Sequence, residues 1–270
     1  MAFLPRLVAI GRYITPDESI WVYRSILFRE ALLNGRWADT LVAGHPGVTT
    51  TWLGAAGMTL QLWLTGEARA SYDWLVKMAV LTPENVEAYR HLSVLLSGGR
   101  VAVALVNSLG IVAAYWLSRR LWGQRVAMVA GLLLALDPFL VGLSGLLHVD
   151  GLSATFVILS LLSLAIGLMP DEAGKRSWIW MLVAGASAGL AVLTKTPTLL
   201  LLPVSGLAML WPLFRNARLS SRARVAAFLR NGIVWGVAFL LVIFVLYPAL
   251  WVTPATVLAT VRGSANRHLG

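Results

Sequence analysis

The stretch GLSATFVILSLLSLAIGLM, residues 151–169, contains no charged side chain. A bilayer core needs about 20 apolar residues in a helix, so this stretch predicts a membrane-spanning helix. The stretch 126–149 is similar and carries one charged side chain, Asp137. Further stretches without any charge are 101–118, 177–194, 196–214 and 232–252. Together they predict an all-α fold, a polytopic bundle of about six transmembrane helices.

The composition supports a membrane protein. Hydrophobic residues make up 58% of the chain and charged residues 13%, whereas soluble domains average about 45–50% and about 25%. The net charge is +10, but no basic patch interleaved with aromatic residues lies on a polar surface, so we expect no nucleic-acid partner. Because the chain has no cysteine, disulfides and thiolate metal sites are excluded.

Basic residues predict the orientation in the membrane. They concentrate in three loops, which contain Arg119, Arg120 and Arg125, then Lys175 and Arg176, then Arg215, Arg218, Arg222, Arg224 and Arg230. The alternate loops contain one lysine, Lys195. An excess of lysine and arginine marks cytoplasmic loops. We therefore expect a multi-pass protein of the cell membrane, with Arg100, Asp150 and Lys195 at the extracytoplasmic face.

The chain divides into three regions. Residues 1–98 form an extracytoplasmic or interfacial region, residues 99–252 the transmembrane bundle, and residues 253–270 the start of an outer loop. Within the first region, 19–34 is typical of an amphipathic interfacial helix, with Ile20, Tyr23, Leu27 and Ala31 at helical spacing. The uncharged stretch 48–64 either spans the membrane or lies in its interface.

Several motifs follow one another in the order found in a known family. They are PDESIWVYRSILFREALLNGRW (16–37), GHPGVTTTWLG (44–54), GGRVAVALVNSLGIVAAYWLSRRLWG (98–123), LLALDPFLVGLSGLLHVDGLSATF (133–156) and GLAVLTKTPTLLLLP (189–203). The sequence thereby resembles the N-terminal half of a bacterial GT-C membrane glycosyltransferase of the protein O-mannosyltransferase and lipid A aminoarabinose transferase type. The resemblance implies a polyprenyl-phosphate-linked sugar as donor, a lipid, glycan or protein as acceptor, surrounding membrane lipids, and a catalytic cavity at the outer face.

The resemblance gives Asp17 and Glu18 a catalytic role. Transfer from a lipid phosphate to a hydroxyl needs a base that takes the acceptor's proton, and we expect Asp17 to be that base with Glu18 as its supporting acid. Alternatively, the two acids only cap the following helix, since acids are favourable in a first turn.

A phosphate leaving group needs cations. Arg100 matches the arginine that opens a transmembrane helix in the family, and we expect it to bind the donor phosphate together with Lys195 and Arg24. Arg100 could instead be an interfacial anchor whose charge reaches the headgroups. Arg24 could simply face water on an amphipathic helix.

The remaining polar candidates are His45, Asp137, His148 and Asp150, which we expect to line the cavity or hold the acceptor. Asp137 lies inside an apolar stretch, where an acid marks a functional site or a hydrogen bond at a kink. His45 could instead shape the turn that enters 48–64. No cofactor is expected. His45, His148 and Asp150 could in principle bind a divalent metal, but their sequence positions alone are a weak signal for a metal site.

Two features depart from the family pattern. The helix that should precede the acidic pair is short and poorly apolar, and the chain stops at ANRHLG (265–270). We therefore expect a fragment of a longer enzyme, whose own activity is doubtful. The rival functions are an inactive membrane fragment and half of a permease, although transporters place polar residues at the midplane and show inverted repeats.

Overall fold

The computed structural model describes residues 2–8, 10, 15–44, 46–78, 80–169, 177–215 and 220–267. These residues form helices and connecting loops without a strand, which confirms the all-α prediction. Two short 3₁₀ helices, η1 (Trp37–Thr40) and η2 (Thr196–Leu200), interrupt the α-helices. The α-helices are α1 (Phe3–Leu7), α2 (Pro16–Leu33), α3 (Val48–Leu64), α4 (Gly66–Val76), α5 (Val86–Leu136), α6 (Pro138–Ser144), α7 (Val149–Gly167), α8 (Ser177–Thr194), α9 (Leu201–Arg215), α10 (Ser221–Leu246), α11 (Ala249–Val252) and α12 (Pro254–Arg267).

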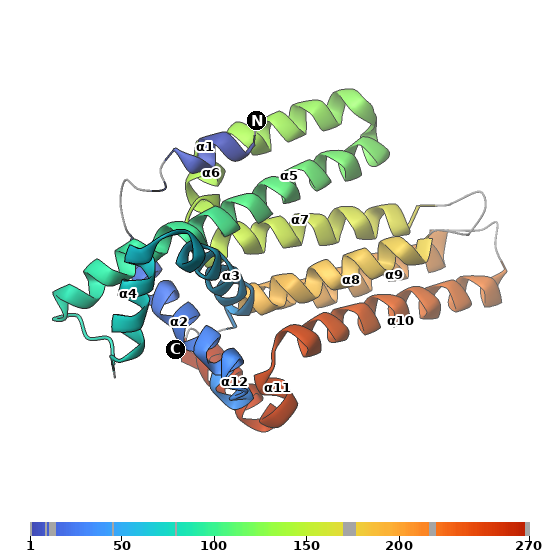
Figure 1. The fold of residues 1–270 in the computed structure, drawn as a ribbon. Helices are drawn as coiled ribbons and strands as arrows, with labels where there is room; N and C mark the ends of the chain where they lie inside the picture. The colour runs from blue at the N-terminus through green and yellow to red at the C-terminus, as the bar shows by residue number, and fades with distance from the viewer. Residues whose placement is uncertain are drawn as a thin grey trace.

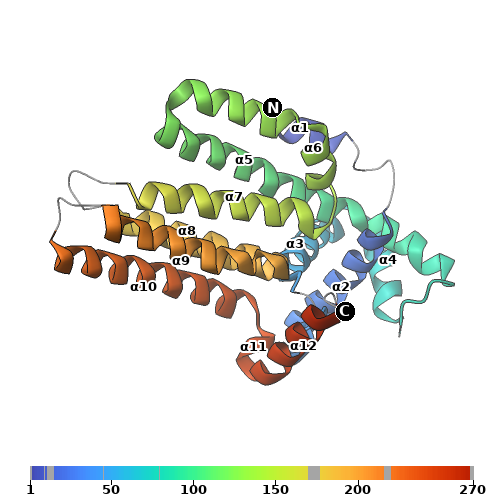
Figure 2. The same cartoon turned by 180° about the vertical axis from the view of Figure 1, so that it is seen from behind.

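The apolar helices form a bundle. In the described part of the chain, α5, α7 and α10 are long and apolar enough to cross a membrane, while 178–194 and 196–211 are shorter apolar helices. Both views show α5, α7, α8, α9 and α10 running alongside one another (Figures 1 and 2). Helix α5 doubles back at Gly123, whose φ of 82° is not helical. Its two arms contain the predicted span 101–118 and the first half of 126–149.

The predicted span 126–149 is wrong as a single helix. Helix α5 ends at Leu136, and α6 begins at Pro138 after a break at Asp137. Proline has no amide hydrogen to continue the helical ladder and disfavours the helical conformation at the residue before it. The apolar run therefore folds into a helix end, a short helix and a loop.

The two ends of the bundle differ. The bend of α5, the end of α7 and the start of α10 lie together, at the right of Figure 1. Helices α2, α3, α4, α11 and α12 gather at the opposite end (Figures 1 and 2). The elements that flank the basic loops thus share one end, as the alternation of charge predicts.

Helix α3 crosses α5 in direct backbone contact. A Cβ atom at Gly57 would lie 2.1 Å from the carbonyl oxygen of Gly98, so only glycine allows this approach. At its start, α3 is tied to α8, because Thr49 and Thr194 share a hydrogen bond of 2.6 Å between their hydroxyls. The stretch 48–64 is therefore a helix packed across the bundle, and it is not among the helices long and apolar enough to span.

The buried face of α2 differs from the predicted one. Of the predicted apolar face, Ala31 is buried, but Ile20 and Leu27 are each 41% exposed, and Trp21 and Phe28 are buried in their place. The reason is the small Ser25 between them, whose hydroxyl would be 2.1 Å from a Cβ at Gly54 of α3. Close contact with α3 on the Ser25 side turns the helix away from the face that its aliphatic spacing indicated.

The two-ended arrangement predicts a pattern of labelling from outside the cell. The chain has no native cysteine, so single cysteines at positions 73 and 120 can be probed with an impermeant thiol reagent in whole cells. We expect labelling at position 73 without permeabilisation, and labelling at position 120 only after it, because basic loops face the cytoplasm. The reverse pattern would mean that the orientation is inverted.

Candidate active site

A buried ion pair joins the start of α2 to α5. The guanidinium of Arg100 donates to both carboxylate oxygens of Glu18, with distances of 2.7 Å from Nε and 2.6 Å from Nη2. The two side chains are 1% and 0% exposed. A third N–H of Arg100 donates to the carbonyl of Ile10 at 2.6 Å. The guanidinium and the carboxylate form a bidentate pair, the arrangement in which arginine binds a carboxylate most strongly.

Glu18 also organises the backbone around it. Its carboxylate accepts the backbone N–H of Thr15 at 3.0 Å and that of Leu147 at 3.0 Å. The first of these bonds belongs to the capping box that begins α2. Burial alone raises the pKa of Glu18, but the hydrogen bonds from Arg100, Thr15 and Leu147 more than offset it, so the pKa lies below its ordinary value. Glu18 is therefore an ionised structural anchor.

The neighbouring acid faces the opposite way. Asp17 is 69% exposed, and its Oδ2 lies 3.4 Å from Nε2 of His148. Nδ1 of His148 lies 3.5 Å from Oδ2 of Asp150. Asp150 in turn accepts a hydrogen bond of 2.5 Å from Nζ of Lys195. Four of the residues singled out in the sequence thus form one continuous chain of polar contacts.

The anchor explains why this chain of contacts forms. Glu18 accepts the N–H of Leu147. Asp17 precedes Glu18 in the sequence and His148 follows Leu147, so this bond brings Asp17 and His148 close together. His148 then caps the start of α7, and Asp150 lies in its first turn. Lys195 follows the last residue of α8. Helices from three separate parts of the sequence therefore deliver their terminal residues to one place.

Arg24 lies on α2 near Asp17. Its guanidinium stacks over the ring of Trp21, with 4.8 Å between Cζ and the ring centroid. Burial lowers the pKa of Arg24, and the negative charge of Asp17 opposes this shift. The edge of the Trp21 ring system packs on Gly47, where a Cβ would lie 2.1 Å from Cη2 of the ring. Within the described ranges, no hydrogen bond or ion pair engages the Arg24 guanidinium, so it is a cation available to a ligand.

Two predicted residues lie outside this group. Asp137 is exposed and caps α6 by accepting the N–H of Leu140 at 2.8 Å, so its contact is local. This agrees with the alternative of a hydrogen bond at a kink. Asp137 also lines a separate pocket at the junction of α5 and α6, so its role in binding stays a prediction. His45 lies outside the described residues. Conversely, Trp21 and the amide of Leu147 could not be found from the sequence, because a ring contact and a backbone donor have no motif.

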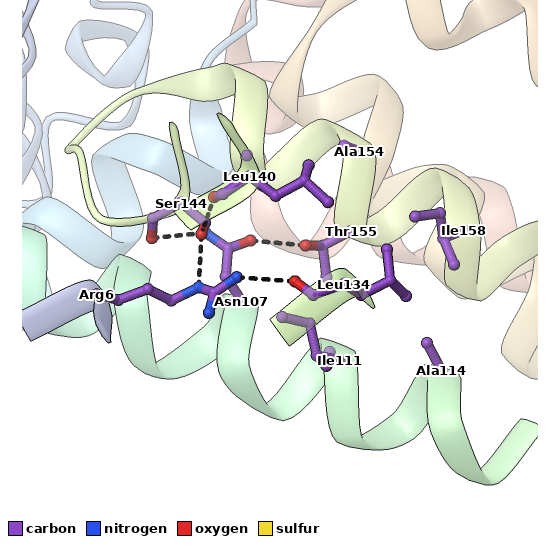
Figure 3. Close-up of a pocket in the computed structure, with 12 residues that line it drawn as sticks. Arg6, Asn107, Ile111, Ala114, Leu134, Leu140, Ser144, Ala154, Thr155 and Ile158 are labelled. Carbon is purple, nitrogen blue, oxygen red and sulfur yellow. Dashed lines mark hydrogen bonds between the residues drawn. The ribbon is translucent and has the colours of Figure 1, made fainter. Parts of the chain in front are cut away.

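A second polar cluster lies inside the bundle. Arg6 is 2% exposed and donates to Ser144 Oγ at 2.6 Å and to the carbonyl of Leu134 at 3.3 Å. Asn107 donates to the carbonyl of Ser144 at 3.1 Å and accepts from Thr155 at 2.7 Å (Figure 3). A small cavity of about 30 Å³ adjoins the cluster. Because these groups satisfy one another, they tie α1, α5, α6 and α7 together.

The buried ion pair predicts a large loss of stability when one partner is neutralised. Glu18→Gln keeps the size of the side chain but leaves Arg100 buried without its counter-charge, which costs about 3–5 kcal/mol. We expect the midpoint of thermal unfolding in detergent to fall markedly. The control is Asp39→Asn, because the ion pair of Asp39 with Arg36 is more than half exposed and such pairs contribute about 0–1 kcal/mol. Equal midpoints for the two variants would contradict the anchoring role.

Comparison with known proteins supports the family that the sequence resembles. A family model described as dolichyl-phosphate-mannose-protein mannosyltransferase matches residues 92–251. The undecaprenyl phosphate-alpha-4-amino-4-deoxy-L-arabinose arabinosyl transferases of Pseudomonas aeruginosa and Pseudomonas paraeruginosa are 34% identical over 110 residues, 40% of this chain. The matched segment spans 20% of each relative. No solved structure matches significantly. Because the family model covers more than half of the sequence, the chain belongs to the dolichyl-phosphate-mannose-protein mannosyltransferase family.

Proposed function

We propose that this chain carries the catalytic carboxylate of a glycosyltransferase, which moves a sugar from a polyprenyl phosphate to a hydroxyl acceptor at the extracytoplasmic membrane face. The family supports the class of reaction, and the printed names of the relatives support a polyprenyl-phosphate donor. The observation that carries the proposal is the exposed carboxylate of Asp17 beside His148. It lies at the end of the bundle opposite the basic loops.

Asp17 acts as the base in a single displacement. The acceptor oxygen attacks the anomeric carbon while the bond from that carbon to the phosphate oxygen breaks. The acceptor proton passes to Asp17, and the lipid phosphate leaves with the electron pair. Attack from the face opposite the phosphate inverts the configuration at the anomeric carbon. Because Asp17 is 69% exposed, an acceptor hydroxyl can reach it.

The leaving phosphate is neutralised by Arg24 and Lys195. Arg24 is the better placed, since its guanidinium is held against Trp21 without a hydrogen-bonded partner in the described residues. Lys195 is 42% exposed and can turn from Asp150 to a ligand. Arg100 donates to Glu18 and Ile10. We therefore assign Arg100 a structural role in positioning the start of α2, in place of the predicted binding of the donor phosphate. The arrangement favours a transferase over a permease, because these polar groups lie at one end of the helices.

The base assignment predicts a rate defect without a binding defect. Asp17→Asn keeps the size of the side chain and leaves the capping box of Thr15 and Glu18 in place, but asparagine cannot take a proton, and losing a general base costs about 10²–10⁴-fold in rate. We expect that loss in transfer from a polyprenyl-phosphate sugar, measured in the enzyme that carries this sequence. The affinity for the donor should be unchanged or slightly higher, because a negative charge near the phosphate is removed. A wild-type rate would mean that Asp17 only helps to begin α2.

The phosphate assignment predicts the opposite effect. Removing a charge-assisted hydrogen bond costs about 1.5–3 kcal/mol, so Arg24→Ala should weaken donor binding by about 10- to 150-fold. Arg24→Lys keeps the charge and should recover part of the loss. The control is Arg36→Ala, whose guanidinium is exposed and paired with Asp39, and which should bind the donor normally. If Arg24→Ala binds the donor as tightly as the control, the phosphate lies elsewhere.

A further inference from the structure

We propose that His148 is the positioning residue for Asp17: it donates from Nε2 to Oδ2 of Asp17 and holds the base in its reactive orientation. The proposal rests on the proposed function of Asp17. It starts from a weakness of that site, since a carboxylate that is 69% exposed has little packing to restrict it. Nε2 of His148 lies 3.4 Å from Oδ2 of this carboxylate, and the charges of Arg24 and Asp17 also interact.

His148 is itself held firmly. It is 19% exposed and occupies the N-cap position of α7. Its Nδ1 lies 3.4 Å from the backbone nitrogen of Asp150. The preceding residue, Leu147, is fixed by its hydrogen bond to Glu18. The imidazole is thus restrained by its own backbone and by the helix that it caps.

The hydrogen-bond pattern assigns the tautomer. The backbone N–H of Asp150 donates to Nδ1 at 3.4 Å, and Oδ2 of the same residue lies 3.5 Å from that nitrogen. We take the backbone donor as the partner of Nδ1, which places the ring proton on Nε2. Nε2 is the atom that faces Asp17, at 3.4 Å. The partner of one ring nitrogen commonly decides which nitrogen carries the proton. The described charged groups around this contact are Asp17 and Arg24 on α2, Asp150 on α7 and Lys195 after α8.

This contact has a chemical consequence. A donor on Oδ2 limits rotation of the carboxylate and leaves Oδ1 free to accept the acceptor's proton. Misplacing a catalytic group by 1 Å can cost about 10²-fold in rate. The ion pair of Glu18 with Arg100 fixes the backbone next to Asp17, and His148 fixes the orientation of the Asp17 side chain. The second device depends on the first, because the hydrogen bond from Leu147 to Glu18 fixes the residue that precedes His148.

Two amide substitutions separate positioning from helix capping. In His148→Gln, the side-chain nitrogen can occupy the place of Nε2 and donate to Asp17. In His148→Asn, the shorter amide reaches only the place of Nδ1, but asparagine is among the best N-cap residues. If His148 positions Asp17, glutamine restores activity and asparagine does not. If His148 only caps α7, asparagine restores activity and glutamine does not.

The kinetic test uses the enzyme that carries this sequence and a polyprenyl-phosphate sugar. We expect His148→Ala to lower kcat by about 10–100-fold with donor affinity within about twofold, and His148→Gln to recover most of kcat. In an Asp17→Asn background, His148→Ala should cause no further loss. Recovery by asparagine, recovery by neither amide, or an undiminished effect in that background would overturn the proposal.

A second measurement needs no turnover and separates this proposal from the proposed function. The ¹⁵N NMR signals of the His148 imidazole should identify the proton on Nε2, and the Nε2 signal should shift in Asp17→Asn. Asp73→Asn, an exposed acid on α4, is the control and should leave it unchanged. An unshifted signal would overturn the contact whatever the enzyme does. A shifted signal with wild-type turnover in Asp17→Asn would instead overturn the role of Asp17 as base.

Discussion

The buried ion pair between Glu18 and Arg100 is the interaction on which the site depends. It joins residues that are 82 positions apart, and through Leu147 it adds a third segment. Removing two charges from water is costly, and the cost is recovered only when every remaining donor and acceptor is satisfied. Here the backbone groups of Thr15, Ile10 and Leu147 supply further hydrogen bonds to the pair. The start of α2, the middle of α5 and the loop before α7 are therefore fixed together.

Much of the bundle could be predicted from hydropathy and charge, because a span must be apolar and backbone groups in a bilayer must bond within helices. The arms of α5 and helices α7, α8, α9 and α10 follow from uncharged stretches. The predictions that were wrong concern the buried face of α2 and the extent of the span 126–149. The buried face of α2 is decided by Ser25 against Gly54, and spacing within α2 alone cannot reveal a partner helix. Pro138 ended a span that hydropathy alone would continue.

The same limit applies to the site. The resemblance singled out Asp17, and the positions of His148, Asp150 and Lys195 between apolar stretches singled out those three residues. The structure brings the four side chains into one series of contacts. Which acid does what could not be predicted. Catalysis and helix capping were alternatives for the pair as a whole, yet the capping box uses Glu18, while Asp17 faces solvent. Pairing of Arg100 with Glu18 was equally hidden, because sequence distance carries no information on it.

The division of labour between adjacent acids makes their order meaningful. Successive residues on an α-helix point about 100° apart, so one carboxylate is directed into the protein while its neighbour is directed outward. The buried position needs the longer side chain, because its carboxylate must meet Arg100 and the amide of Leu147 at the same time. A chain with the two acids exchanged would have the same composition, charge and helix signal. The aspartate at the buried position would nevertheless be too short to meet both Arg100 and the amide of Leu147. The glutamate at the exposed position would have one more methylene and therefore more rotational freedom.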